Sequence, residues 1–337
     1  MLQKVVRAVV LILLIAAIGK QAAQGQAPLL GLTQPGTKYS SALLGTSPSL
    51  TVFNGAIYLA FKGDYSDNSL WLTYSTSSGA FTNPGKNFKN IVMLPGTAPA
   101  ITSWNSKLWL SYTGSDGYVY LVSSADGLTF SSPVVARQCT GCQLITSNSQ
   151  PSLAVYNNFL WIAWTNPNGL AYATTGDGSN WVYDKGCDSN IATPLNGTTV
   201  GLAVFKQDLY FAYGANKASG WELVVCHTNG LDISNPAGYA ITNTYPSLQV
   251  GGGISIYADP SYMYLAYKDI STSNYIHVTG TTDAVNFTST AYSGIRENAD
   301  SFTAAGTTVF NSSTYYFAYV ENSSSHHLWV STAPYPY

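Results

Sequence analysis

Charge is scarce in this 337-residue chain, because Asp, Glu, Lys and Arg together make up only 9% of it, against about a quarter of an ordinary soluble domain. Only three residues are arginine, namely Arg7, Arg137 and Arg296. Nucleic acids and anionic membrane surfaces are bound through basic patches, so the composition argues against both classes of partner. Asn, Ser, Thr and Tyr must form most of the surface instead, and such a surface suits neutral, hydroxyl-rich ligands.

Long apolar runs are also missing, except at the N-terminus. Lys4 and Arg7 precede an apolar run at residues 8–18, and small residues follow at 25–27. This pattern predicts a secretory signal peptide over residues 1–27, and the run is shorter than the roughly 20 residues of a membrane-spanning helix. A retained N-terminal anchor is the alternative. Removal of the signal peptide leaves 11 basic and 16 acidic residues in the mature chain. We expect this mature protein to be secreted, periplasmic or on the cell surface, with no membrane span.

Cysteine is rare as well: the four are Cys139, Cys142, Cys187 and Cys226. In an exported chain they are expected to form disulfides, and four cysteines allow three pairings. A structural zinc site would need a second pair of ligands at a spacing like that of Cys139 and Cys142, and the sequence has none. We favour one disulfide between Cys139 and Cys142 and a second, between Cys187 and Cys226, that links neighbouring repeats.

What the chain does contain is a four-residue phrase that occurs six times. The copies are Tyr58-Leu59-Ala60-Phe61, Trp109-Leu110-Ser111-Tyr112, Trp161-Ile162-Ala163-Trp164, Tyr210-Phe211-Ala212-Tyr213, Tyr264-Leu265-Ala266-Tyr267 and Tyr316-Phe317-Ala318-Tyr319. Counted from the small third residue, the steps are 51, 52, 49, 54 and 52 residues. A period near 50 predicts a repeat architecture in which neighbouring units bury each other's apolar faces.

Each repeat is expected to contain four antiparallel strands. In the first repeat, strand-like runs at 47–53 and 57–61 flank Asn54-Gly55, which is a strong hairpin signal. Two further strands are expected at 70–74 and 86–93. Four strands per repeat predict an all-β, six-bladed β-propeller, with repeats near 47–94, 95–146, 147–196, 197–243, 244–297 and 298–337. The last repeat is one strand short, so residues 39–45 are expected to complete it, in a single domain over 28–337 that we expect to be a monomer.

The phrase itself predicts how the blades pack. Its third residue is Ala five times and Ser once, which suggests that adjacent sheets approach closely at this position. The aromatic residues on either side are expected to fill the wider space between blades, because repeated aromatics on strands usually pack in a core. A role as ligand platforms is the alternative.

Several repeats carry an acidic turn between their third and fourth strands. The clearest copies contain Asp126, Gly127 and Phe130; Asp177, Gly178 and Trp181; and Asp283 and Phe287. The carboxylate can accept backbone N–H bonds in the turn, Gly permits a positive φ, and the aromatic side chain anchors the turn. These turns resemble the Asp boxes of the sialidase superfamily, Ser-x-Asp-x-Gly-x-x-Trp, in a form one residue shorter.

The resemblance covers nearly the whole chain after residue 27, and it implies a propeller whose acidic turns are structural and lie away from the catalytic face. It also implies a test of activity, because sialidases bind their substrate carboxylate with three arginines and use a Tyr–Glu nucleophile pair and an acid/base Asp. Only Arg137 and Arg296 remain after the signal is removed. Sialidase chemistry by that mechanism is therefore excluded.

The strongest polar group of the chain is expected on the opposite face, in the segment that enters the sixth repeat. It comprises Arg296, Glu297 and Asp300, with Asp269 and Glu321 expected nearby. Asp300-Ser301 stands where we align a Pro before a small residue in repeats 1, 2, 3 and 5, such as Pro246-Ser247 of the fifth, so function is expected to override packing here. The alternative is that these charged side chains are simply exposed to solvent in a loop, or that the last blade is irregular because it closes the ring.

A second polar loop, at residues 62–68, is rich enough in oxygen to suggest calcium, although it lacks EF-hand spacing and a plain polar loop is the other interpretation. No other metal site or cofactor is expected.

For function we favour a non-catalytic, lectin-like carbohydrate-binding module. The alternatives are a glycoside hydrolase or lyase that uses Glu297, Asp300, Asp269 or Glu321, and a protein-interaction scaffold.

Overall fold

The structure is a computed structural model, and it describes a little under two thirds of the chain. The described residues are 37–43, 46–64, 66–76, 81, 85–136, 150–166, 169–185, 193–194, 199–217, 220–228, 239–245, 250–269, 276–287, 306–310, 313–321 and 326–334. All of the regular elements in these ranges are strands.

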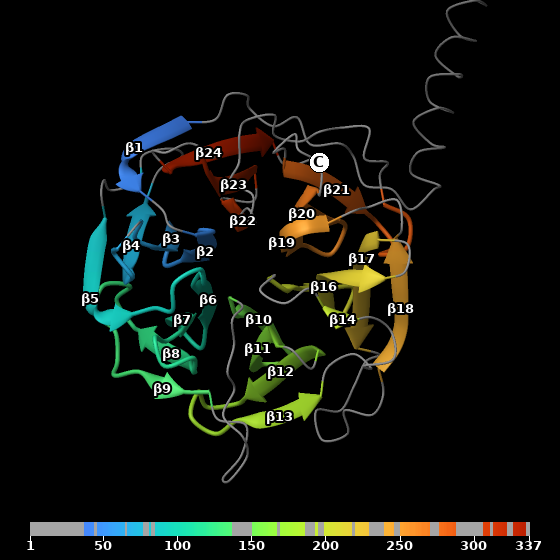
Figure 1. Cartoon of the computed structure of the whole chain (residues 1–337), viewed down its shortest axis with the longest axis horizontal. Helices are drawn as coiled ribbons and strands as arrows, with labels where there is room; N and C mark the ends of the chain where they lie inside the picture. Colours follow the sequence, from blue (N-terminus) through green and yellow to red (C-terminus); the bar gives the residue numbers. More distant parts are fainter. Residues whose placement is uncertain are drawn as a thin grey trace, which may run out of the picture.

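The strands form six antiparallel sheets arranged around a common axis, as Figure 1 shows in a view down that axis. This arrangement confirms the predicted six-bladed β-propeller. We number the blades in chain order from β2. In blades 1, 2, 3 and 5 each described strand pairs with the next one in the sequence, so the strands follow one another from the axis outwards.

The first three blades each have four strands. Blade 1 contains β2 (Ser49–Phe53), β3 (Ala56–Lys62), β4 (Ser69–Ser75) and β5 (Lys86–Val92). Blade 2 contains β6 (Ala100–Trp104), β7 (Lys107–Thr113), β8 (Val119–Ser124) and β9 (Val134–Val135). Blade 3 contains β10 (Ser152–Tyr156), β11 (Phe159–Asn166), β12 (Gly169–Thr175) and β13 (Val182–Lys185).

The last three blades depart from this plan. Blade 4 contains β14 (Thr193–Pro194), β15 (Gly201–Phe205), β16 (Asp208–Lys217), β17 (Gly220–Thr228) and β18 (Tyr239–Tyr245), and β14 and β15 follow each other along the same edge of β16. Blade 5 has three strands within the described residues, β19 (Val250–Ala258), β20 (Met263–Asp269) and β21 (Ile276–Thr281). Blade 6 contains β22 (Gly306–Phe310), β23 (Thr314–Val320) and β24 (His327–Pro334).

The N-terminal strand β1 (Thr37–Leu43) completes blade 6, because it pairs antiparallel with β24. This confirms the expected pairing, two residues earlier in the chain than the predicted 39–45. The aromatic ring of Tyr39 also packs edge-on against Phe81 of blade 1, at 5.7 Å between centroids. The strand therefore contacts both the last blade and the first.

The turn residues of the hairpins between first and second strands have positive φ, and most of these residues are not glycine. Asn54 and Gly55 have φ of 47° and 73°, which confirms the predicted Asn-Gly turn. The equivalent pairs in the next three blades are Asn105-Ser106, Asn157-Asn158 and Lys206-Gln207, all with positive φ. Asn readily adopts this conformation, whereas Ser106, Lys206 and Gln207 are of types that seldom do.

The small third residue of the phrase pairs with another small residue on the innermost strand of its blade. The six pairs are Ala60 with Ser49, Ser111 with Ala100, Ala163 with Ser152, Ala212 with Gly201, Ala266 with Ser255 and Ala318 with Gly306. The inner strands converge at the axis, so there is little room for side chains. At Gly201 an added Cβ would lie 2.5 Å from Cγ1 of Ile256 in the next blade.

This register corrects our alignment of the last two repeats. The small residue of blade 5 is Ser255, and Pro246-Ser247 lies before β19 rather than within it. The small residue of blade 6 is Gly306, so Asp300-Ser301 does not occupy the Pro-small position.

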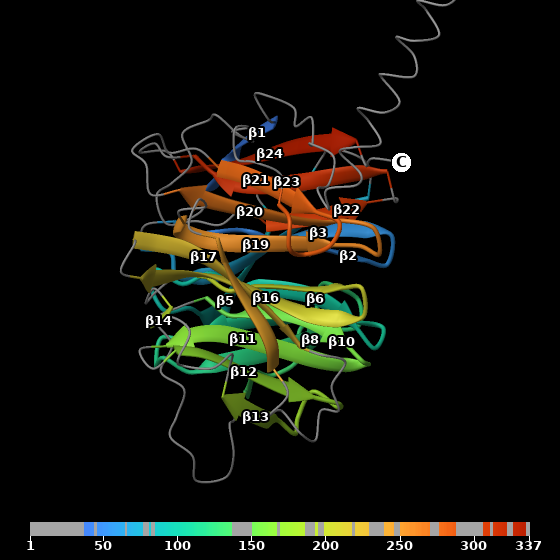
Figure 2. The same cartoon turned by 90° about the vertical axis from the view of Figure 1, so that its right-hand side faces the viewer.

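Antiparallel order gives the propeller two different faces. One face carries the hairpins between first and second strands and the acidic turns between third and fourth strands, and we call it the turn face. The other carries the loops between second and third strands and the connections between blades, and we call it the loop face. Figure 2 shows from the side how the inner strands run between the two faces.

Candidate functional site

The three acidic turns share one hydrogen-bond pattern on the turn face. Oδ1 of Asp177 accepts the backbone N–H groups of Ser179 and Asn180, both at 2.8 Å. Asp126 does the same for Leu128 and Thr129, and Asp283 for Val285 and Asn286. Each carboxylate also accepts the hydroxyl of the residue two positions earlier, Ser124, Thr175 or Thr281.

These hydrogen bonds stabilise the charged form of the aspartates. The N–H groups of Asn180 and Ser179 hold the pKa of Asp177 far below its usual range, and those of Leu128 and Thr129 do so for Asp126. Partial burial raises the pKa of Asp283, but its hydrogen bonds outweigh that effect and the net shift is downward. A carboxyl group held in this way is unsuited to accept a proton near neutral pH.

Each acidic turn also packs against the preceding blade. Gly178, at φ 80°, lies against the indole ring of Trp109, the first residue of the phrase in blade 2, and Gly127 lies against the ring of Tyr58 in blade 1 in the same way. In blade 5 the position is taken by Ala284, 5% exposed, which packs in one cluster with Tyr210 of blade 4. The turns therefore join neighbouring blades.

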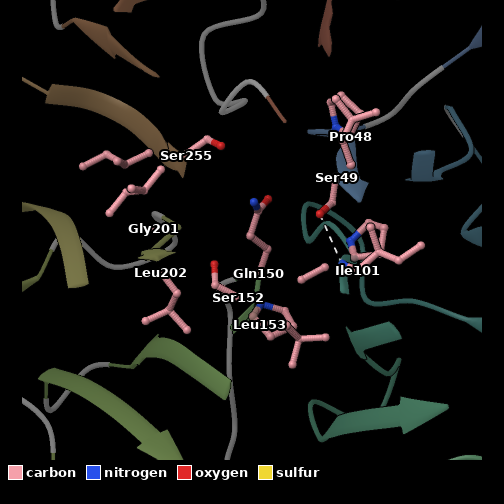
Figure 3. Close-up of a pocket in the computed structure, with 15 residues that line it drawn as sticks. Pro48, Ser49, Ile101, Gln150, Ser152, Leu153, Gly201, Leu202 and Ser255 are labelled. Atoms are coloured by element: carbon pink, nitrogen blue, oxygen red, sulfur yellow. Dashed lines mark hydrogen bonds between the residues drawn. The ribbon is translucent and has the colours of Figure 1, made fainter. Parts of the chain in front are cut away.

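A small cavity lies on the axis, where the inner strands of five blades begin at the loop face. Its volume is about 100 Å³, and its lining comes from the starts of β2, β6, β10 and β15 and from the middle of β19. Figure 3 shows the side chain of Gln150 pointing into the cavity between Ser49 and Ser255. None of the lining residues that the structure describes is ionisable.

Hydroxyl groups around this cavity link inner strands that do not pair with one another. Ser49 accepts the backbone N–H of Ile101 at 3.2 Å, a bond drawn in Figure 3, and Ser152 donates to the carbonyl of Val200. Thr199 accepts the N–H of Ile254 at 2.7 Å. The serines near the axis thus have a structural use, because they satisfy backbone groups that the converging strands leave free.

The polar loop of blade 1 contains a cation of its own. The Nζ atom of Lys62, a residue only 3% exposed, donates to the carbonyl of Gly63 at 2.8 Å and to Oδ1 of Asn68 at 3.2 Å. Burial lowers the pKa of this ammonium, although Asp64 and Asp67 partly oppose the shift. Two of the oxygens in the loop that we considered for calcium are therefore bonded to an ammonium group.

Blades 1 and 2 each contain a second kind of acidic motif, which the sequence did not reveal. In this motif an aspartate accepts hydrogen bonds from an aromatic side chain and from a backbone N–H group. Asp67 accepts the indole N–H of Trp71 at 2.7 Å and the backbone N–H of Ser69 at 3.0 Å. Asp116 accepts the hydroxyl of Tyr120 at 2.6 Å and the backbone N–H of Tyr118.

The aromatic rings of this motif stack on the fourth residue of the repeated four-residue phrase. Trp71 stacks on Phe61 and Tyr120 on Tyr112, with interplanar angles of 12° and 17°. The bond to Asp116, together with burial, raises the pKa of Tyr120 to about 12. The sequence signal for this motif is an Asp that stands four residues before an aromatic residue of the third strand. It was missed because the signal occurs in only two blades.

Glu321, one of the predicted site residues, follows β23 on the loop face and has two partners. Its carboxylate lies 3.1 Å from Nζ of Lys38 on β1 and 2.9 Å from Nδ1 of His327. Lys38 also lies over the ring of Trp329, with Nζ 5.5 Å from the centroid. Glu321 therefore adds a side-chain contact between the N-terminal strand and blade 6, beside the backbone pairing of β1 with β24.

The other predicted site residues are only partly covered. Arg296, Glu297 and Asp300 lie outside the described residues, and Asp269 is described only as the last residue of β20, opposite Val250. Asp269 ends β20 and Glu321 directly follows β23, and these are the second strands of neighbouring blades, so both residues lie at the loop face. Their part in a site stays a prediction.

The predicted disulfides stay predictions too. Cys226 is buried on β17 at 1% exposed, while Cys139, Cys142 and Cys187 lie outside the described residues.

Within the described ranges, no three or more His, Cys, Asp or Glu side chains come together in a way that could hold a metal ion. The same part of the chain contains no helix suited to crossing a bilayer.

Comparison with solved structures identifies the class of fold. A Trypanosoma rangeli sialidase, in complex with the inhibitor DANA, superposes with a TM-score of 0.59 at 12% identity, over 91% of this chain and 60% of the sialidase. The Aleuria aurantia lectin AAL, in complex with Fucα1-6GlcNAc, has a TM-score of 0.59 at 10% identity, over 86% of this chain and 92% of the lectin. A mutant of AofleA from Arthrobotrys oligospora has a TM-score of 0.58 at 9% identity, over 86% of this chain and 84% of that one.

The chain therefore has a sialidase-like β-propeller fold, and it spans about 60% of the length of the sialidase that it matches. No protein-family model matches the sequence, and no curated protein matches it.

Proposed function

We propose that this protein is an exported, non-catalytic propeller that binds carbohydrate through its loop face. The observation that carries the proposal is that three described carboxylates on that face are hydrogen-bonded or ion-paired to other groups of the protein. Asp67 and Asp116 each hold an aromatic side chain and a backbone N–H group, and Glu321 holds Lys38 and His327. These contacts give the three carboxylates structural roles, and the low charge of the chain favours hydroxyl, amide and aromatic side chains on the rest of the surface.

The axial cavity also supports binding rather than catalysis. Glycoside hydrolysis needs two carboxyl groups on either side of the scissile bond, whereas the described lining of the cavity consists of neutral residues. A volume of about 100 Å³ lies well below the roughly 300 Å³ at which enclosed ligand sites begin. The cavity can hold water or one ligand substituent, so a saccharide would bind mainly to the surrounding loops.

The solved structures of similar fold add support by analogy. A lectin in complex with a fucosylated disaccharide and a sialidase in complex with an inhibitor share this architecture with our chain. Fold alone does not determine function, so the proposal depends on the surface chemistry together with that analogy. Export through the predicted N-terminal signal, and a monomeric state, are further parts of the proposal.

A glycan array combined with a panel of chromogenic glycosides tests this function. We expect binding to glycans without release of chromophore. Turnover that disappears in a Glu297→Gln variant would contradict the proposal and favour the hydrolase or lyase. If neither binding nor turnover is detected, the carbohydrate proposal fails and a protein-interaction scaffold becomes the better hypothesis.

A further inference from the structure

One residue at the axis of the ring departs from the repeat pattern. Five repeats have a short side chain, or none, two positions before the small residue at the axis. These five residues are Ser47, Ala98, Thr199, Gly253 and Ala304. The third repeat has Gln150 at this position. The ring can therefore be built without a long side chain here, and a repeat that breaks its own pattern is a candidate for function.

The carboxamide of Gln150 is available to a ligand. Figure 3 shows it pointing into the axial cavity, and among the described residues it has no hydrogen-bond partner. Thr199, at the same position of blade 4, instead uses its hydroxyl to accept the backbone N–H of Ile254 at 2.7 Å. Gln150 is partly exposed, so its N–H donors and its carbonyl acceptor can be reached from solvent.

Two serines of the lining add further hydrogen-bonding groups. Ser49 accepts the backbone N–H of Ile101 at 3.2 Å, and no described residue accepts the hydrogen of its own hydroxyl. Ser152 donates its hydroxyl hydrogen to the carbonyl of Val200, which leaves lone pairs of its Oγ as acceptors. These serines belong to blades 1 and 3, so the cavity offers donors and acceptors from more than one side.

Most of the remaining lining is apolar. It consists of prolines and aliphatic side chains, among them Ile101, Leu153 and Leu202 (Figure 3). The described lining carries no charge, so an ionised group would lose hydration here without gaining a counter-charge. The volume of about 100 Å³ corresponds to about three water molecules at roughly 30 Å³ each. The cavity therefore suits a short, neutral branch that has both a polar and an apolar end.

An acetamido group has these properties. It is neutral, and its methyl group can contact the aliphatic lining. Its C=O and N–H point in opposite directions because the amide is trans, so they need partners on different sides of the cavity. The N–H groups of Gln150 can donate to the carbonyl, and Oγ of Ser152 can accept the N–H. A hydroxyl group would bury no apolar surface against the aliphatic residues and gains less from this cavity.

We propose that the axial cavity receives the acetamido group of a neutral, N-acetylated sugar, and that Gln150 is the residue that selects for this group. The inference rests on the proposed carbohydrate-binding function and narrows it to one class of sugar.

Two variants test the role of Gln150, and each borrows the residue that another repeat has at the same position. Gln150→Ala gives blade 3 the residue of blade 2, Ala98, so the ring should fold with an unchanged melting temperature. Gln207→Gly is the matched control, because it removes a carboxamide from the turn face at a φ of 73°, where the hairpin of blade 1 has Gly55.

The probes are pairs of neutral oligosaccharides that differ only in acetamido against hydroxyl groups, such as chitotriose and cellotriose. Isothermal titration calorimetry with the full-length protein measures both members of each pair. We expect the wild type and Gln207→Gly to bind the N-acetylated member more tightly. Gln150→Ala should lower that preference about tenfold, which is the loss of roughly one hydrogen bond, and leave binding of the other member unchanged.

A second measurement uses the wild type alone. In the complex with chitotriose, an acetamido methyl group should show intermolecular NOEs to methyl groups of Ile101, Leu153 or Leu202, which line the cavity. If Gln150→Ala lowers the melting temperature, Gln150 also supports the fold, and the NOEs then decide whether the acetamido group enters the cavity.

The remaining outcomes separate the inference from the function on which it rests. Equal binding of both members of every pair overturns the inference and leaves carbohydrate binding intact. A preference that Gln150→Ala retains, or an acetamido methyl group without NOEs to the cavity, has the same consequence. Binding restricted to acidic glycans overturns the inference about neutral sugars. If the wild type binds no glycan, the proposed function fails and this site fails with it.

Discussion

Substitution of Gly178 by alanine should measure how tightly the acidic turns join neighbouring blades. Gly178 has a φ of 80°, and an added Cβ would collide with Cη2 of Trp109 and lie 2.9 Å from Cζ2 and Cζ3. The indole cannot move away easily, because its N–H donates to the carbonyl of Trp104 at 3.1 Å and the residue is 8% exposed. The substitution therefore combines backbone strain with steric overlap.

The magnitude follows from these two effects. A left-handed conformation costs an alanine about 1–2 kcal/mol relative to glycine, and overpacking of a buried site costs about 1–3 kcal/mol. We expect Gly178→Ala to lower the free energy of unfolding by about 2–5 kcal/mol. Gly55→Ala is the matched control, since Gly55 has a similar φ of 73° but no atom within 4 Å of the added Cβ. It should lose only the backbone contribution, about 1–2 kcal/mol.

Urea unfolding followed by tryptophan fluorescence gives both values on the same scale. The difference between the two variants isolates the contact between blades 2 and 3. If Gly178→Ala is no more destabilising than Gly55→Ala, then Trp109 does not confine the turn and the proposed joint between blades is wrong. A third variant, Ala284→Gly, should change stability by less than about 1 kcal/mol, because blade 5 already accommodates a methyl group at this position.

Three further predictions concern stability and binding. Deletion of residues 37–43 should lower the stability of the whole ring in a single unfolding transition, because β1 pairs with the last blade; loss of only a local signal in hydrogen exchange would contradict this. The pKa of Asp283 is lowered on folding from its ordinary value of 3.8, so its charge stabilises the fold above that pH and the stabilisation is lost as pH falls through the folded value; Asp283→Asn should therefore be less stable than wild type at pH 6, with a gap that narrows below about pH 4 in acid denaturation curves. Replacement of Arg296 and Glu297 by alanine should leave the melting temperature unchanged and remove glycan binding, whereas a loss of fold with binding retained would show that they serve the last blade instead.

The architecture could be predicted because its determinants are local and repeated. The phrase fixes the second strand of every blade, Asn54-Gly55 fixes a hairpin, and the acidic turns carry their own hydrogen-bonding groups within four residues. The missing strand of the sixth repeat followed from counting strands, and β1 fills that place. Each of these signals acts over a few residues, so no knowledge of distant contacts is needed to read it.

The register of the last two blades could not be predicted in this way. A Pro before a small residue marks the start of the inner strand in three blades, but the Pro-Ser pair of the fifth repeat precedes the strand, and Ser255 takes the position at the axis. Convergence of the inner strands demands a small residue at this position whatever the preceding sequence is. That demand arises only when six sheets meet, so it is a property of the ring and not of the repeat.

For the functional predictions, too, some features could be inferred from the sequence and others depend on tertiary contacts. Composition pointed to neutral, hydroxyl-rich ligands, and together with the predicted signal peptide it argued against the three-arginine mechanism, since these expectations need no tertiary contact. The pairing of Asp64 with His326 joins residues 262 positions apart, and the bonding of Lys62 inside its loop depends on how that loop closes. The sequence determined the units of this protein, whereas contacts between the first and last units exist only in the closed tertiary structure.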